Sequence, residues 1–193
     1  TVKIQSETAP ESAFVAECEL LQDLQHPNVV TFLGVSFDEV PLMLVVEHTN
    51  GGTLRSFAMQ DDGDADLRQL MYLAEQVAEG MAYVSGAGIV HRDLKAESVV
   101  LIQTKNVLIA KISEFGMAGK EEMFASTTGS MTVDQIAVQW AAPEAILRAK
   151  FSTKSDVCAG TPSKGVKRKE NHSSALSTAP SFCNGHGYLI CTR

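Results

Sequence analysis

A charged loop between two apolar segments restricts the fold of this chain more than any other feature. Residues 89–102 read IVHRDLKAESVVLI, and they follow a long amphipathic segment at residues 67–84. The charged and ring-bearing residues of the loop are His91, Arg92, Asp93 and Lys95. Loops that are positioned by rigid elements on both sides often carry catalytic groups. We therefore expect a functional site at residues 91–95.

Residues 67–84 contain the most regular helical pattern in the chain. Apolar residues recur at intervals of three and four, which places them on one face of a helix. They are Leu67, Leu70, Met71, Ala74, Val77, Ala78, Met81 and Val84. We expect the methionines of this segment and Tyr83 to pack in the core. Gly86 and Gly88 are expected to end the helix.

The first 25 residues predict a strand end followed by a helix. Lys3 lies in the short apolar stretch TVKI, which has the character of a strand. Thr8 and Glu11 have the spacing of a capping box, so we expect a helix over residues 11–25. Glu17 falls on the apolar face of that helix. It is either a surface residue at the edge of the apolar stripe or the partner of a cation.

Two pairs of short apolar runs predict antiparallel strands. NVVTFLGVSF, at residues 28–37, is separated from PLMLVVEH by the acidic turn Asp38 and Glu39. VVLI and VLIAKI, separated by QTKN at residues 103–106, form a second expected hairpin. Residues 117–139 have no clear periodicity and contain small hydroxyl residues, which is typical of a mobile segment.

Composition narrows the class of protein. The chain has 193 residues, 45% of them hydrophobic, which is enough for one or two domains with a core. Its apolar runs are far too short to cross a bilayer, and nothing at the start resembles a signal peptide. The four cysteines show no CxxC spacing, so we expect reduced thiols without a zinc site or disulfides. We therefore expect a cytoplasmic protein, or the intracellular part of a larger or receptor protein, with no membrane segment in this chain. Because the chain starts at Thr1 rather than at a methionine, we expect it to be a fragment.

The end of the chain differs in charge from the rest. Residues 159–193 carry a net charge of +4, so the total of −7 leaves −11 for residues 1–158. This acidic balance argues against a nucleic-acid partner. Residues 158–193 are rich in Ser, Thr, Gly and Pro without periodicity, and we expect them to be disordered.

Six motifs, in the expected order, resemble those of eukaryotic protein kinases. They are TVKI with Lys3, the helix with Glu17, HRDLKAES, SEFG at residues 113–116, VQWAAPEAI at residues 138–146 and FSTKSDV at residues 151–157. The chain looks most like the tyrosine-kinase and tyrosine-kinase-like groups. The resemblance implies a truncated two-lobed α+β fold over residues 1–157. Its expected parts are an N-lobe sheet with one helix (1–47), a hinge (47–52), a C-lobe that ends at the start of helix F (53–157) and a non-kinase tail (158–193).

The resemblance also implies a role for each site residue. The expected activity is transfer of the ATP γ-phosphate to a protein hydroxyl, so ATP, magnesium and a protein substrate or signalling partner are the expected ligands and partners. The expected catalytic residues are Asp93, which accepts the substrate proton, Lys95, which offsets phosphate charge, and the motif residues His91 and Arg92. The expected ATP contacts are Lys3 with Glu17, the gatekeeper Val46, the hinge residues Glu47 and Thr49, Val100 and Glu114. Asp156 is expected to hold the HRD backbone from a frayed end.

Two positions depart from the kinase pattern. Glu114 stands where the family has aspartate and Ser98 where it has asparagine, and the resemblance makes both of them magnesium ligands. Magnesium requires near-octahedral oxygen ligands, so a longer carboxylate and a shorter hydroxyl are expected to impair the site. Three interpretations stay open: a kinase, a pseudokinase that binds nucleotide or acts as a scaffold, and a truncated or misread product after Val157. Lys95, and the absence of tyrosine from residues 117–139, favour serine or threonine as the acceptor.

Overall fold

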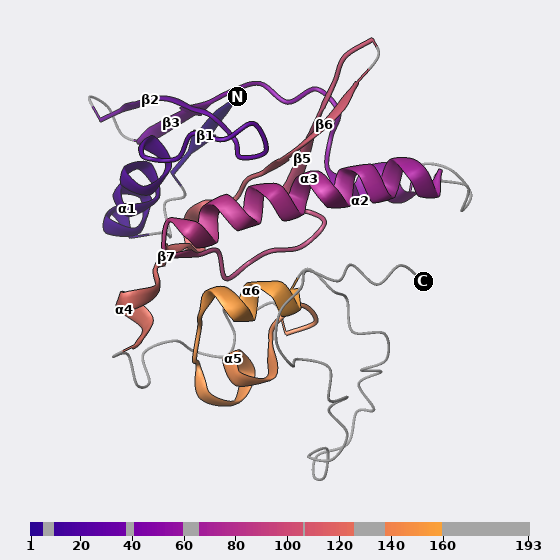
Figure 1. Ribbon diagram of the computed structural model, residues 1–193. Coiled ribbons are helices and arrows are strands. Elements are labelled where there is room, and N and C mark those ends of the chain that lie inside the picture. Colours follow the sequence, from indigo (N-terminus) through magenta and orange to yellow (C-terminus); the bar gives the residue numbers. More distant parts are fainter. Residues whose placement is uncertain (6–9, 38–40, 60–65, 106, 126–137, 160–193) are drawn as a thin grey trace, which may run out of the picture.

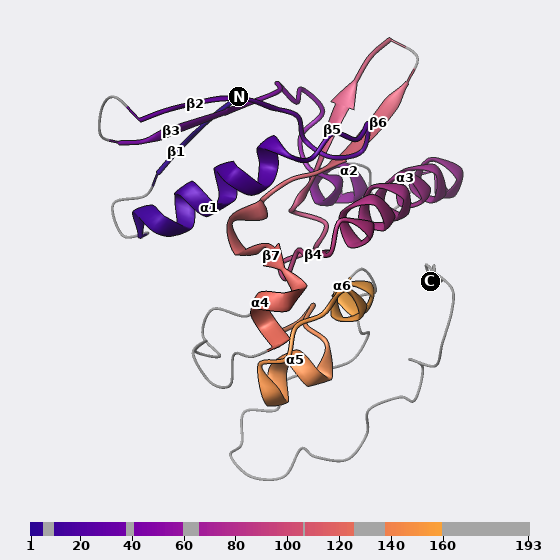
Figure 2. The same ribbon diagram turned by 60° about the vertical axis from the view of Figure 1, so that its left-hand side comes forward.

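The computed structural model describes residues 1–5, 10–37, 41–59, 66–105, 107–125 and 138–159. A sheet with one covering helix forms the upper part of the molecule, and short helices gather in the lower part (Figures 1 and 2). This arrangement confirms the predicted α+β class. No helix within the described ranges is long and apolar enough to cross a membrane.

Three antiparallel strands form the upper sheet, in the order β1-β3-β2. They are β1 (Val2–Ile4), β2 (Phe32–Ser36) and β3 (Met43–Val46). The pairing of β2 with β3 confirms the first predicted hairpin, although residues 38–40 of its turn lie outside the described residues. Lys3 is in register with Leu44, which is 1% exposed, so both side chains lie on the inner face of the sheet.

Helix α1 (Glu11–Gln22) lies beneath the sheet and buries the predicted face (Figure 1). Its buried residues are Phe14, Glu17, Cys18 and Leu21. The predicted end was wrong, because the helix stops three residues before Gln25. Pro10, in an extended conformation, occupies the N-cap position without a side-chain hydrogen bond. Thr8, the expected cap, lies outside the described residues.

Helix α3 (Leu67–Gly86) is the long helix that the sequence pattern predicts. The Asp66 carboxylate caps its start by accepting a hydrogen bond from the Arg68 amide at 3.0 Å. Its buried residues are Leu73, Gln76, Gly80, Met81 and Val84. The predicted core face was therefore partly wrong, since Leu67 and Met71 are each 56% exposed. The buried face is shifted because β6 packs along the side that carries Gln76 and Gly80.

A buried polar network joins α3 to the second predicted hairpin. The hairpin strands are β5 (Val99–Gln103) and β6 (Leu108–Ile112). The Asn28 side-chain amide donates to Gln76 Oε1 at 3.1 Å and to the Ala110 carbonyl at 3.0 Å. The Ala110 amide in turn donates to Gln76 Oε1 at 2.9 Å. Gly80 permits this close approach, because a Cβ there would lie 2.7 Å from Ile112 Cδ1 and 2.8 Å from the Asn28 carbonyl oxygen.

The rest of the chain surrounds the predicted catalytic loop. Its elements are α2 (Leu54–Met59), β4 (Ile89–Val90), the 3-10 helix η1 (Phe115–Met117), β7 (Gly119–Lys120), α4 (Glu121–Ala125), α5 (Pro143–Arg148) and α6 (Thr153–Ala159). The β4 and β7 strands pair with each other, and α4, α5 and α6 lie on the side of this pair away from the upper sheet (Figure 2).

Two expectations about these elements need correction. Residues 117–125, expected to be irregular, contain β7 and α4, whereas residues 126–137 lie outside the described residues. Asp156 was expected at a frayed end, but α6 continues to Ala159 and buries Asp156 to 2% exposure. The predicted tail began at residue 158, but Cys158 and Ala159 belong to α6; residues 160–193 lie outside the described residues.

Candidate functional site

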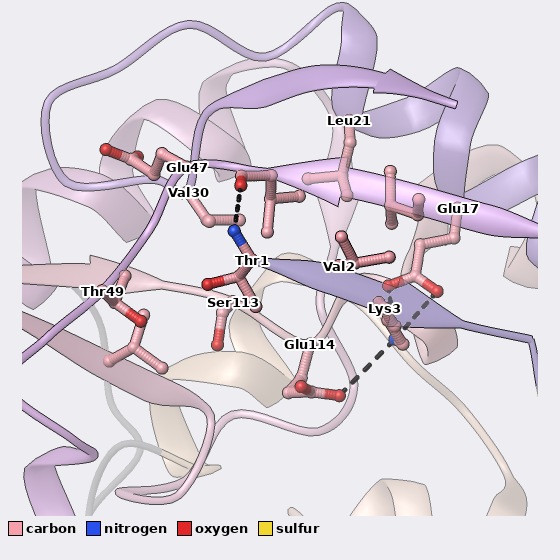
Figure 3. Close-up of a pocket in the computed structure, with 13 residues that line it drawn as sticks. Thr1, Val2, Lys3, Glu17, Leu21, Val30, Glu47, Thr49, Ser113 and Glu114 are labelled. Carbon is pink, nitrogen blue, oxygen red and sulfur yellow. Dashed lines mark hydrogen bonds and ion pairs between the residues drawn. The ribbon is translucent and has the colours of Figure 1, made fainter. Parts of the chain in front are cut away.

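A cavity of about 270 Å³ opens between the upper sheet and the β5–β6 hairpin (Figure 3). Its lining includes the apolar residues Leu21, Val30, Leu44, Val46 and Val100. The seven residues expected to contact ATP all line it: Lys3, Glu17, Val46, Glu47, Thr49, Val100 and Glu114. An apolar slot with an ammonium group at one end can hold a flat ring together with a polar extension.

Lys3 lies between two carboxylates at the polar end of the cavity. Its Nζ donates to Glu17 Oε1 at 2.7 Å and to Oε2 at 3.0 Å, and it lies 3.6 Å from Glu114 Oε2 (Figure 3). Burial alone would lower the pKa of Lys3, but Glu17 and, more weakly, Glu114 outweigh it and raise the pKa above its ordinary value. The predicted Lys3–Glu17 ion pair is confirmed, and Lys3 is a charged ammonium.

Asp93 and Lys95 face each other in the predicted catalytic loop. Lys95 Nζ donates to Asp93 Oδ1 at 2.8 Å and to Oδ2 at 2.6 Å. Ser98 closes the loop, because its hydroxyl donates to the Lys95 carbonyl at 2.8 Å and accepts from the Lys95 amide at 2.9 Å. The amide and hydroxyl of Ser113 both donate to the Ser98 carbonyl, at 2.8 Å and 2.9 Å. These bonds connect the catalytic loop to Ser113, which lines the cavity.

Asp156 and His91 hold the start of this loop. Asp156 accepts from the His91 amide at 2.6 Å and from the Arg92 amide at 2.9 Å. Arg92 has φ of 67°, a strained value for a residue other than glycine. The fully buried His91 ring contacts the Ser113 carbonyl through Nε2 at 2.9 Å, and its Nδ1 accepts from the Asp93 amide at 3.3 Å. Burial lowers the pKa of His91, and a neutral ring protonated on Nε2 satisfies both bonds.

Glu47, expected to meet a ligand through its backbone, has a fixed side chain. Its Oε1 accepts from Lys111 Nζ at 2.6 Å, from the Thr31 amide at 2.7 Å and from the Thr31 hydroxyl at 2.8 Å. The Glu47 amide donates to the Thr31 carbonyl at 2.9 Å, so this amide is already used within the protein. Burial alone would raise the pKa of Glu47, but the hydrogen bonds from Lys111 and Thr31 outweigh it and lower the pKa.

Comparison with known proteins identifies the family. The family model described as protein tyrosine and serine/threonine kinase matches residues 1–159. The chain belongs to this kinase family. The tyrosine-protein kinase transforming protein Fps of avian sarcoma virus (strain PRCII) is 37% identical over 161 residues, which are 81% of this chain and 29% of that protein.

Two further relatives are tyrosine-protein kinase Fer of Rattus norvegicus and ephrin type-A receptor 7 of Gallus gallus. Fer is 35% identical over 159 residues, and the ephrin receptor is 34% identical over 157 residues. Each match covers 81% of this chain but only 19% of Fer and 16% of the receptor. The chain therefore spans less than a third of the length of these relatives.

Arg92 of the kinase HRD motif is enclosed by aromatic rings. Its guanidinium carbon lies 4.3 Å from the ring centroid of Phe124 on α4 and 5.3 Å from that of Phe151. Arg92 Nε also donates to the Met117 carbonyl. Gly119 leaves room for this arrangement, because a Cβ there would lie 2.7 Å from Phe124 Cζ. These contacts hold α4 against the catalytic loop.

The expected magnesium ligands of the kinase family do not form a metal site in this arrangement. Ser98 is 0% exposed and its hydroxyl bonds twice to Lys95, so the predicted role of Ser98 as a ligand is not supported by the geometry. The carboxylate of Glu114 is directed towards Lys3. No group of three or more His, Cys, Asp or Glu residues in the described part of the chain is placed to hold a metal ion. In this arrangement both side chains bond within the protein, and their role as magnesium ligands stays a prediction.

Sequence reasoning missed the Glu47–Lys111 pair and the aromatic contacts of Arg92. Lys111 lies inside the apolar run VLIAKI, and this was the available signal, because a buried lysine requires a partner. Phe124 offered no comparable signal, since its segment has no periodicity and its contacts come from residues distant in sequence.

Proposed function

We propose that residues 1–159 are part of an intracellular, cytoplasmic protein kinase domain that binds ATP and transfers its γ-phosphate slowly to a protein hydroxyl. The observation that carries this proposal is the Lys3–Glu17 ion pair, which lines the same cavity as the gatekeeper Val46 and the hinge residues Glu47 and Thr49. Lys3 would hold the α- and β-phosphates, while the hinge backbone and the apolar wall would hold the adenine ring.

The catalytic loop supplies the groups that act on the acceptor. Phosphoryl transfer depends on positioning and on neutralising charge rather than on covalent help from the protein. Asp93 would orient the acceptor hydroxyl and take its proton, and Lys95, 2.6 Å away, would then be free to offset charge on the phosphate. His91 and Asp156 support this role, because they fix the loop backbone from both sides. Magnesium supplies charge neutralisation in the family at large.

We propose slow phosphoryl transfer because two residues expected near the phosphates, Glu114 and Ser98, differ from the kinase pattern. Glu114 is one methylene longer than aspartate, and the Ser98 hydroxyl is bonded to Lys95. A misplacement of about 1 Å at a reacting centre can cost on the order of 100-fold in rate. Ring binding at the hinge uses neither residue, and the reversion of Glu114 to aspartate keeps a carboxylate at that position, so turnover should change far more than ATP affinity.

The paired reversion Glu114→Asp with Ser98→Asn tests this proposal in the full-length protein. We expect turnover with ATP, magnesium and a peptide acceptor to rise at least about 100-fold, with little change in ATP affinity. Lys3→Met serves as the control that lowers ATP affinity in both backgrounds. If the unaltered protein already turns over at about 1 to 100 per second, the usual kinase range, the proposed impairment is wrong.

A second candidate function is that of a pseudokinase, which binds nucleotide or a signalling protein without chemistry. The closed Ser98–Lys95 loop favours it, because the buried hydroxyl is not available to a metal. The same reversion separates the two candidates. A doubly reverted protein that binds ATP but gains no measurable turnover would support the pseudokinase.

The acceptor residue is proposed separately. Lys95, in contact with Asp93, is typical of serine/threonine-type loops, whereas Fps and Fer are named tyrosine kinases. We expect serine or threonine as the acceptor, because in this chain it is Lys95 that contacts Asp93, the residue proposed to accept the proton. A library of peptides with serine, threonine or tyrosine acceptors decides this, and phosphorylation confined to tyrosine would exclude our expectation.

A further inference from the structure

The Glu114 side chain places a carboxylate beside Lys3 at the polar end of the cavity. Its backbone is fixed on both sides, because the preceding Ser113 amide donates to the Ser98 carbonyl at 2.8 Å and the following Phe115 is 1% exposed. The backbone of Glu114 itself has φ of 64°. The flexible part is therefore the side chain, which is 58% exposed and places Oε2 3.6 Å from Lys3 Nζ.

The residues around Lys3 supply more negative than positive charge. Gly116 lies against the Lys3–Glu17 pair, since a Cβ there would be 3.3 Å from Glu17 Oε2 and 3.6 Å from Lys3 Nζ. This packing keeps the Glu114 segment beside the ion pair. Lys3 is the one cationic side chain among the described residues that line the cavity, and it faces two carboxylates. The side chains at this end therefore carry a net charge of −1.

A phosphate chain and an uncharged ligand meet this end differently. The phosphates of ATP would compete with Glu114 for Lys3 while remaining close to both carboxylates, and like charges a few ångströms apart repel strongly at a partly buried site. A bridging metal would relieve the repulsion, but Ser98 does not offer it a ligand. The ring-binding wall at Leu44, Val46 and Val100 is unaffected by these charges.

We propose that Glu114 is a built-in counterion of Lys3, which makes the cavity bind an adenine nucleoside more tightly than ATP when no divalent metal is present. The inference rests on the proposed function, because it takes this cavity to be the adenine site. ATP still binds, but its affinity is limited by the carboxylate rather than by the hinge. The site then senses the charge of its ligand through one side chain.

Titration calorimetry on the full-length protein tests the inference with adenosine and with ATP, each in EDTA and in magnesium. In EDTA we expect adenosine to bind more tightly than ATP. Glu114→Gln should raise ATP affinity at least about tenfold and leave adenosine affinity within about twofold, because it removes one charge near the phosphates. Glu114→Asp keeps the charge and should keep the preference for adenosine. Glu79→Gln on α3, also exposed, makes the same change in net charge away from the cavity and should change neither affinity.

The outcomes separate this inference from the proposed function. Binding of neither ligand would refute the adenine site itself, and with it both proposals. Tighter binding of ATP than of adenosine in EDTA would overturn the inference and leave the proposed function standing. An equal effect of Glu114→Gln on both ligands would also overturn it, since the carboxylate would then act on folding rather than on the phosphates. A melting temperature for each variant shows whether the protein is folded.

Discussion

Replacing Lys111 by methionine tests whether a buried ion pair holds the hinge. Lys111 Nζ lies 2.6 Å from Glu47 Oε1, and the two side chains are 9% and 21% exposed. Removal of one partner from a buried pair costs about 3 to 5 kcal/mol, because the other charge stays buried. Glu47 is partly exposed and keeps two hydrogen bonds from Thr31, so we expect a smaller loss of about 2 to 3 kcal/mol.

The loss is measured by urea unfolding of the full-length protein, read from amide exchange in residues 99–112, so that the transition of this domain is followed by itself. The double variant Lys111→Met with Glu47→Leu serves as the matched control. Its loss in free energy of unfolding should be smaller than the sum of the losses of the two single variants by at least about 1 kcal/mol, because no unpaired charge remains. A loss below about 0.5 kcal/mol in Lys111→Met, or additive effects, would refute the reasoning.

The pH dependence of the same variant gives an independent check. The pKa of Glu47 is lowered in the folded protein from an unfolded value of about 4.3, so its contribution to stability is complete above about pH 5. The contribution is lost as the pH falls through the lowered pKa. The stability difference between the unaltered protein and Lys111→Met should therefore shrink below about pH 4. A difference that stays constant from pH 7 to pH 3 would exclude the ion pair as its origin.

Three further predictions concern packing and the catalytic loop. Gly80→Ala should destabilise the domain by about 1 to 3 kcal/mol, because the added Cβ would lie 2.7 Å from a side chain of β6. Gly86→Ala in the same helix is the control: its Cβ would meet nothing within 4 Å, so it should stabilise the domain by about 0.5 kcal/mol. Urea unfolding compares the two variants. Asp156→Asn should cost about 1 to 3 kcal/mol and speed amide exchange at residues 91–92, since one acceptor becomes a donor; unchanged protection would contradict this. Phe124→Leu should speed proteolysis in α4, because it removes the cation–π contact with Arg92, which is worth about 0.5 to 2 kcal/mol. Equal rates of proteolysis in the variant and the unaltered protein would show that packing alone holds the helix.

Local patterns along the chain were sufficient for the elements that frame the site. Apolar spacing predicted α3, and alternating apolar runs with polar turns predicted both hairpins. The Lys3–Glu17 pair was predicted by the resemblance to kinases, because the position of Glu17 on the apolar face of α1 alone left a surface residue as the alternative. The helix and the hairpins depend on the spacing of apolar residues along the chain, which can be read directly from the sequence.

Tertiary structure decided which polar groups of the site are free and which are already bonded. Ser98 and Glu114 both look like metal ligands in the sequence, yet one is bonded to Lys95 and the other is directed towards Lys3. The partner of Glu47 lies 64 residues away in the chain, on β6. Which donor meets which acceptor depends on how strands and helices distant in sequence pack together. Periodicity places a side chain on a face, but only packing assigns its partner.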